Sequence, residues 1–219
     1  MLPDRLQAVE ERIRNAAARA GRRREDITLI AVTKVFPASA ILDAYALGLR
    51  DFGENYVQEF ERKEPEVRSL EGARFHLIGH LQSNKARRSA SLFHCVETVD
   101  SGKLARKLNE GDRPLEVFLE VKLSEEQSKA GAAPAELKAL IDDVRACPNL
   151  TLRGLMTMPP WSQDAETARP YFARLRELAG AHGLNSLSMG MSNDFEVAIE
   201  EGATHIRIGT ALFGPRKRA

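Results

Sequence analysis

This sequence contains few cysteine and tryptophan residues and has no strong excess of charge of one sign. The two cysteines, Cys95 and Cys147, stand far apart without a C-x-x-C pair, which argues against a zinc site or a disulfide framework. The formal net charge is only +1, so no overall field favours a nucleic acid, a membrane surface or an acidic partner. The basic clusters at 22–24 and 87–88 lack interleaved aromatic residues and are typical of a solvated surface. We therefore expect no metal, nucleic acid or membrane as partner.

Long hydrophobic runs and low-complexity linkers are also missing. No segment approaches the roughly 20 apolar residues of a membrane span. Residues 1–20 carry Asp4, Glu10 and Glu11 where a signal peptide would have an unbroken apolar stretch. Hydrophobic residues make up 43% of the chain and charged residues 29%, which is ordinary for a globular protein that buries a core. We expect one domain over residues 1–219 and a cytoplasmic location.

Short apolar segments alternate with helix-length segments along the chain. Segment 4–20 has apolar residues at helical spacing and predicts an amphipathic opening helix. Strands are expected at 27–32, 51–53, 74–79, 95–99, 115–121, 150–158, 187–190 and 205–209. This alternation predicts an α/β fold, a single (β/α)8 TIM barrel with an extra N-terminal helix. An open doubly wound sheet is the alternative, because periodicity does not distinguish a closed parallel sheet from an open one.

Lys34 stands directly after the apolar run of the first strand. A lysine at that strand end would emerge at the barrel face where active sites of this architecture collect. Burial there would lower the pKa of its amine, and a neutral amine is the form that attacks an aldehyde to give a Schiff base. The alternative is a lysine that leaves the strand for solvent, and position alone favours that alternative.

Two neighbouring strand ends near the C-terminus carry groups suited to a phosphate. Gly190 permits close backbone approach, and Ser192 offers a hydroxyl just before a helix. Simple capping of that helix by Asn193 or Asp194 is the alternative. Segment 207–210 repeats the arrangement at the next strand end, and barrels frequently bind phosphate after their seventh and eighth strands. The pair of motifs predicts a phosphate site.

Six ordered motifs give a resemblance that spans nearly the whole chain. They are AVTK at 31–34, FGENYVQE at 52–59, FHLIGHLQ at 75–82, GLMT at 154–157, SMGMSND at 188–194 and RIGTALFG at 207–214. Together they make the sequence resemble the pyridoxal phosphate homeostasis protein family. The resemblance implies a barrel similar to the N-terminal domain of alanine racemase. It also implies that pyridoxal 5'-phosphate (PLP) is the cofactor, held as a Schiff base on Lys34.

The resemblance implies roles for other residues. It places three residues at the phosphate: Ser192, Gly209 and Thr210. It places Arg207 at the pyridine nitrogen, where an arginine can only donate, opposes protonation of the ring nitrogen and makes PLP a poor electron sink. Alanine racemase takes its second base from an additional domain, for which only 215–219 remain in this sequence. We therefore expect no catalytic residues and little or no catalysis.

The function implied is PLP binding in PLP (vitamin B6) homeostasis and delivery, with effects on amino-acid balance. PLP-dependent apoenzymes would be the recipients, and a monomer is expected because the domain that makes the usual racemase dimer contacts is missing. A PLP-dependent amino-acid racemase or lyase and a cofactor-free Schiff-base aldolase are the alternatives, and each would use Lys34. Phe36 stands where many relatives have a second lysine, and Thr33 where a serine is frequent.

Several further residues have two interpretations. Asn55 is a candidate cofactor contact or a helix cap, and Met156 is a candidate pocket residue or a space-filling one. His76 and His80 suggest a metal pair, but no third ligand is near in sequence and a structural role is favoured. A PLP-handling role of Lys122 and Lys129 is the weaker alternative to solvated charges.

Overall fold

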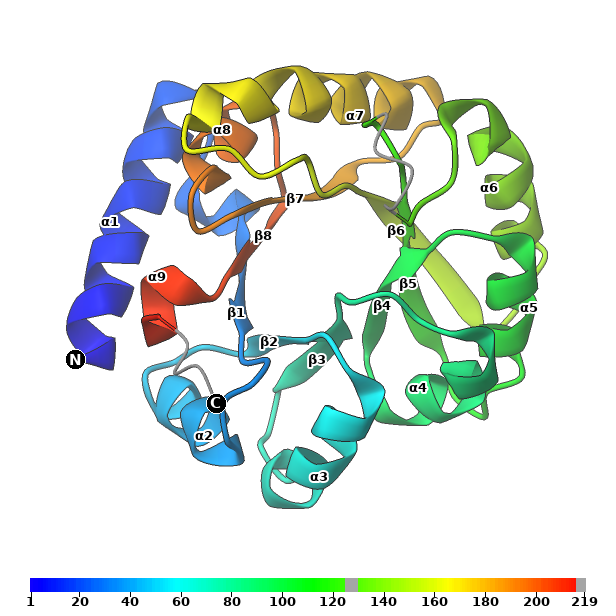
Figure 1. The fold of residues 1–219 in the computed structure, drawn as a ribbon, viewed down its shortest axis with the longest axis horizontal. Helices are drawn as coiled ribbons and strands as arrows, with labels where there is room; N and C mark the ends of the chain where they lie inside the picture. The colour runs from blue at the N-terminus through cyan, green and yellow to red at the C-terminus, as the bar shows by residue number, and fades with distance from the viewer. Residues whose placement is uncertain (125–129, 216–219) are drawn as a thin grey trace.

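The sheet of this protein closes on itself. The structure is a computed structural model that describes residues 1–124 and 130–215. Within that part, neighbouring strands pair in parallel and in chain order, and β8 pairs with β1 (Figure 1). The strands are β1 (Thr28–Val32), β2 (Asp51–Glu54), β3 (Arg74–Leu77), β4 (Cys95–Val99), β5 (Leu115–Glu120), β6 (Leu150–Met156), β7 (Ser186–Met191) and β8 (His205–Ile208). The predicted TIM barrel is confirmed, and the open sheet is excluded.

Helices surround the barrel (Figure 1). They are α1 (Leu2–Arg19), α2 (Ala38–Ala46), α3 (Val57–Val67), α4 (Ala86–Leu92), α5 (Gly102–Asn109), α6 (Leu137–Arg145), α7 (Arg169–Ala181), α8 (Phe195–Glu200) and α9 (Thr210–Phe213). The extra N-terminal helix is α1, which packs against α8 and α9. Its Arg12 guanidinium binds the Glu196 carboxylate at 2.7 Å. No helix in the described ranges has both the length and the apolarity of a membrane span.

The buried apolar side chains of the barrel form two separate clusters. Most buried aliphatic and aromatic side chains form one core between strands and helices, which explains the apolar runs of parallel strands. A second, small cluster of Cys95, Phe118 and Met156 is separate from it. The Phe118 ring makes an edge contact with the ring of His205 at 5.1 Å between centroids. Because β5 and β8 lie on opposite sides of the ring of strands in Figure 1, this contact passes through the barrel interior.

The strand ends decide where the functional groups lie. All strands are parallel, so their carboxyl ends meet at one mouth of the barrel. Four strands end earlier than the sequence predicts, β5 and β8 by one residue, and β3 at Leu77 and β6 at Met156 by two. Gly79 and Met158 therefore belong to loops at the mouth, and both line a cavity there.

Candidate functional site

A cavity of about 430 Å³ opens at the mouth of the barrel. The predicted site residues that line it are Lys34, Asn55, Ser192, Arg207, Gly209 and Thr210. They lie in or just after β1, β2, β7 and β8, so segments far apart in sequence meet here. The structure thus brings together every predicted site residue except Met156.

Met156 lies in the barrel interior. Its side chain is fully buried in the cluster with Cys95 and Phe118, and it is not among the described residues that line the cavity. Met158, two residues later, does line the cavity. The position of Met156 therefore fits the alternative interpretation, in which it fills space in the core.

The backbone next to Lys34 is held in an unusual conformation. Val35 has φ of 64°, in the left-handed region that a β-branched residue rarely adopts. The Val35 N–H donates to Glu59 Oε1 at 2.6 Å, and Glu59 Oε1 also accepts from Lys63 Nζ at 2.6 Å. Strain of this kind persists only where surrounding contacts over-determine it. Helix α3, which carries Glu59 and Lys63, therefore fixes the turn that carries Lys34.

Lys63 extends this support to the other side of Lys34. Its ammonium donates to the Thr33 carbonyl at 2.9 Å and to Glu54 Oε1 at 2.8 Å. The Thr33 hydroxyl donates to the same oxygen at 2.7 Å. Burial raises the pKa of Glu54, and the contacts with Lys63 and Thr33 oppose that shift. One signal of this network was visible in the sequence and was missed, the i, i+4 spacing of Glu59 and Lys63.

The two phosphate motifs are adjacent in space. Ser192 Oγ accepts a hydrogen bond from the Ala211 N–H at 3.2 Å, which ties the loop after β7 to α9. Gly190 has φ of +93°, and a Cβ there would lie 2.5 Å from that of Ala198. Only glycine fits this close approach of β7 to α8. Ser192, Gly209 and Thr210 line one cavity.

The polar side chains beside these motifs do not cap the helices that follow them. The Asp194 carboxylate accepts from the Met191 N–H at 2.6 Å and closes the turn after β7. The Asn193 amide donates to the Ser162 carbonyl at 2.8 Å. Neither α8 nor the helix after Asn55 begins with a side-chain cap. Asn193, Asp194 and Asn55 all line the cavity instead.

Arg207 is a buried cation at the cavity. It is 3% exposed, its Nη1 donates to Ser188 Oγ at 2.6 Å, and its Nη2 donates to the Thr157 carbonyl at 2.9 Å. Burial lowers the pKa of Arg207, and the Glu97 carboxylate, 3.9 Å away, opposes this shift. An arginine remains protonated under such conditions. A ligand in the cavity therefore meets a fixed positive charge that donates and does not accept.

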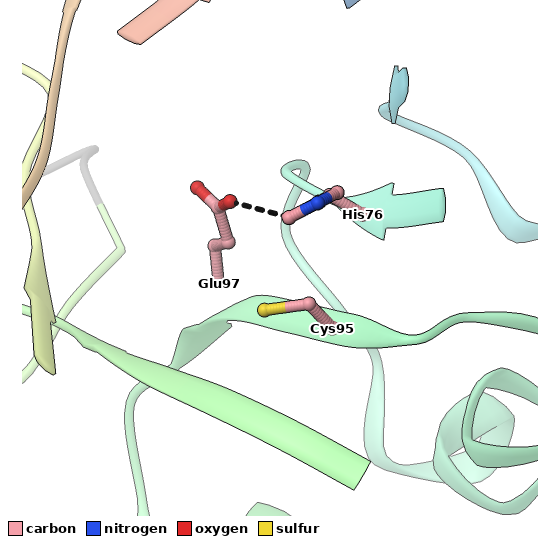
Figure 2. A group of neighbouring side chains, drawn as sticks. All are labelled: His76, Cys95 and Glu97. Atoms are coloured by element: carbon pink, nitrogen blue, oxygen red, sulfur yellow. Dashed lines mark hydrogen bonds and ion pairs between the residues drawn. The ribbon is translucent and has the colours of Figure 1, made fainter. Parts of the chain in front are cut away.

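A buried chain of charged groups continues from Glu97. Figure 2 shows His76, Cys95 and Glu97, whose ligand atoms lie within 4.8 Å of one another, as a metal ion would need. The His76 ring is held through both nitrogens, Nδ1 by Glu97 at 2.9 Å and Nε2 by Asp51 at 3.0 Å. Burial lowers the pKa of His76, but these contacts outweigh it and raise the pKa well above its usual value. The geometry is that of an imidazolium between two carboxylates.

The other polar residues weighed from the sequence lie elsewhere. His80 is 60% exposed and stands 4.0 Å from Asp100 at the mouth, so it does not share a site with His76. Lys122 lines a neighbouring cavity at the mouth. Lys129 lies outside the described residues.

Comparison with known proteins agrees with this geometry. The model of a family described as alanine racemase, N-terminal domain, matches residues 5–217. The pyridoxal phosphate homeostasis protein of Pseudomonas aeruginosa is 48% identical over 221 residues, covering 98% of this chain and 96% of that protein. The protein of the same name from Aquifex aeolicus is 41% identical over 224 residues, covering 98% of each chain.

Solved structures give the same picture. PipY of Synechococcus elongatus with PLP bound matches with a TM-score of 0.84 at 37% identity, over 98% of this chain and 100% of PipY. Alanine racemase of Corynebacterium glutamicum shares the fold, with a TM-score of 0.69 at 18% identity over 61% of its length.

The chain is a barrel of the alanine racemase N-terminal type. This class is defined by the closed barrel, by the lysine at the end of the first strand and by the match to the family model. Within this class the chain belongs to the pyridoxal phosphate homeostasis protein family, as its sequence motifs predict.

Proposed function

We propose that this protein binds PLP in the cavity at the barrel mouth, as a Schiff base on Lys34, and serves PLP homeostasis and delivery. The observation that carries the proposal is the meeting of Lys34, Ser192 and Arg207 in one cavity of about 430 Å³. An amine, a phosphate-binding hydroxyl and a fixed cation are what a phosphorylated pyridine aldehyde requires. The match to PLP-bound PipY over nearly the whole chain supports the same ligand.

Each lining group has a distinct task in this proposal. The Lys34 amine binds the cofactor covalently, and the turn held by Glu59 sets its direction. Ser192, with the backbone of Gly209 and Thr210, binds the phosphate, while Asn55 contacts the cofactor from the end of β2. PLP itself supplies an aldehyde carbon to which an amine adds reversibly. Reversible attachment suits a carrier, because the same bond that holds the cofactor also lets it go.

Catalysis is expected to be weak or absent. Arg207 can only donate to a pyridine nitrogen, and an unprotonated ring withdraws electrons poorly. The curated relatives are named homeostasis proteins, in agreement with this view. We propose PLP-dependent apoenzymes as recipients, with amino-acid balance affected through them.

The test is a spectral titration of the purified protein with PLP. Wild type should develop the visible absorbance band of a protonated Schiff base, and borohydride should abolish it. Lys34→Ala should not form the band, whereas the exposed Lys103→Ala should behave as wild type. A band of wild-type intensity in Lys34→Ala would refute the proposed attachment, and no band in wild type would favour a cofactor-free aldolase.

A second assay separates carrier from enzyme. Transfer of PLP to an apoenzyme should be measurable, and racemisation or elimination of amino acids should stay near background. Turnover of alanine at the rates typical of enzymes, about 1–1000 per second, would overturn the carrier assignment.

A further inference from the structure

Three side chains that are buried together in the barrel have the chemistry of metal ligands. They are His76, Cys95 and Glu97, and one ligand atom of each lies within 4.8 Å of those of the other two (Figure 2). Buried polar and charged groups are costly unless they are paired or coordinate a metal ion. None of the three is among the described residues that line the cavity of Lys34, so the proposed PLP contacts do not use them.

Strand pairing brings the three groups together. His76 on β3 is the register partner of Cys95 on β4. Glu97 lies two residues after Cys95 on the same strand, so both side chains project from one face of β4. The sequence shows no further ligand close to His76, and the fold supplies two from the neighbouring strand.

The three ligand types indicate which metal ions fit. A thiolate, an imidazole nitrogen and a carboxylate oxygen together suit zinc and similar transition-metal ions, whereas magnesium and calcium are bound by oxygen ligands alone. Three protein ligands leave the fourth tetrahedral position to a water molecule. The cluster therefore matches the ligand set of a zinc-type site.

Neighbouring groups orient the ligand atoms as they do in metal sites. His76 Nδ1 lies 2.9 Å from Glu97 Oε1, and its Nε2 lies 3.0 Å from Asp51 Oδ1. A metal-ligating histidine almost always donates its other ring N–H to a carboxylate, a carbonyl or water, and Asp51 provides such a carboxylate. The Ser188 hydroxyl donates to Glu97 Oε2 at 2.5 Å, which holds the other carboxylate oxygen toward His76.

Exchange of protons for a divalent ion leaves the buried charge unchanged. Without metal, the His76 imidazolium balances the Glu97 carboxylate, and the Cys95 thiol is neutral. A divalent ion displaces the Nδ1 proton of His76 and the thiol proton of Cys95, so two positive charges leave as protons and two arrive with the ion. An apolar interior tolerates this exchange because the net charge stays the same.

A route to His76 exists at the end of the barrel opposite Lys34. Asp51 and His76 line a cavity of about 340 Å³. Other lining residues are the first residues of their strands, Thr28 of β1 and His205 of β8 among them, so this cavity lies at the amino-terminal mouth. An ion entering there does not pass the cofactor cavity.

We propose that His76, Cys95 and Glu97 bind one divalent transition-metal ion of the zinc type. The ion takes the place of the proton between His76 and Glu97 and links β3 to β4 where a buried ion pair links them without metal. The site is separate from the cavity of Lys34, so the proposal does not depend on PLP binding.

Titration of the full chain with cobalt(II) tests the site. Cobalt(II) occupies zinc sites and reports its ligands by absorbance, and the protein is first freed of PLP and treated with a chelator. Wild type should develop a near-ultraviolet thiolate-to-cobalt band that saturates at one ion per chain. Zn²⁺ should displace the band, and excess Mg²⁺ should not. No saturable band in wild type, or displacement by Mg²⁺, would overturn the proposal.

The two cysteines assign the band. Cys95→Ser should lose it, whereas Cys147→Ser, which changes the other buried cysteine of the chain, should keep it. Cys95 is then the only thiol, so the band in Cys147→Ser identifies the ligand even if Cys95→Ser does not fold, which thermal melting shows. A band that persists in Cys95→Ser, or is lost in folded Cys147→Ser, would refute the site.

Asp51 tests the ligation by His76. Asp51→Asn removes the charge that orients the imidazole and should raise the dissociation constant for Zn²⁺ about 10-fold to 100-fold. Asp43→Asn, on the exposed face of α2, is the matched control and should bind Zn²⁺ as wild type does. Calorimetric titration in buffers of different ionisation enthalpy measures both the affinity and the release of two protons per ion. Unchanged affinity in Asp51→Asn, or binding without proton release, would contradict ligation through His76 Nδ1.

Discussion

Glu120 illustrates how one residue ties stability to pH. It ends β5 and is 4% exposed, and its Oε2 has no hydrogen-bond partner in the part of the chain that the structure describes. Its pKa of about 7 in the fold exceeds the ordinary 4.5, so the folded chain keeps a proton that the unfolded chain releases. Stability from this group is therefore lost as pH rises through that window, by up to about 3 kcal/mol above it.

Glu120→Gln should remove this pH dependence. We expect the variant to match wild type near pH 5 and to exceed its free energy of unfolding by up to about 3 kcal/mol near pH 8. Urea unfolding of PLP-free protein at both pH values measures the difference, with Glu11→Gln as control. A difference that does not grow with pH would contradict the assigned burial of an ionised carboxylate.

The sequence predicted some site residues better than others. Lys34 and Ser192 carry their signal locally, since each follows an apolar strand at a strand end. Glu120 gave no such signal, because its unpaired state depends on which groups the fold brings near it. The sequence indicated Met156 as a cavity residue and not Met158. The strand β6 ends at Met156, and the side chain two residues later lies in the loop at the cavity and not in the core.

The junction of β7 and α8 depends on one glycine. Gly190→Ala puts a Cβ 2.5 Å from that of Ala198 at a φ of +93°. We expect a loss of at least about 2 kcal/mol in the free energy of unfolding, together with weaker PLP binding, because the Ser192 loop is displaced. Gly180→Ala in α7, where a Cβ meets nothing within 4 Å, is the control and should be neutral or stabilising. Equal stability of both variants would argue against the close approach.

The pairing of β3 with β4 depends on buried charge. His76→Leu would leave the Glu97 carboxylate, whose pKa the His76 contact helps to hold at about 2 against the effect of burial, without its main counter-charge. Removing one partner of a buried ion pair costs about 3–5 kcal/mol, and we expect a loss of that size in urea unfolding. His80→Leu, at the exposed mouth, should change stability little. A neutral His76→Leu would show that the buried imidazolium is not required.

For the molecule as a whole, the sequence predicted the architecture because strand and helix alternation is a local property repeated along the chain. Closure of the barrel is not local, since it requires β8 to reach β1, and the resemblance supplied what periodicity lacked. Likewise the contacting side chains of Asp51, His76 and Glu97 join three strands, and their spacing in the sequence does not predict these contacts. One domain over residues 1–219 stays a prediction, which a single calorimetric transition would support.

The protein is predicted to be a monomer. Among the described residues few large apolar side chains are exposed, and the most exposed aromatic, Trp161, belongs to the cavity mouth. Light scattering coupled to gel filtration should give a molar mass near 24.3 kDa with and without PLP. A mass twice that value would show that the protein is a dimer.

Attachment of the cofactor to Lys34 can be tested directly. Borohydride reduction of the PLP-loaded protein followed by peptide mapping identifies the modified lysine directly. We expect the pyridoxyl group on the peptide that contains Lys34, in close to one equivalent per chain. Modification spread over surface lysines, with the Lys34 peptide unmodified, would contradict it.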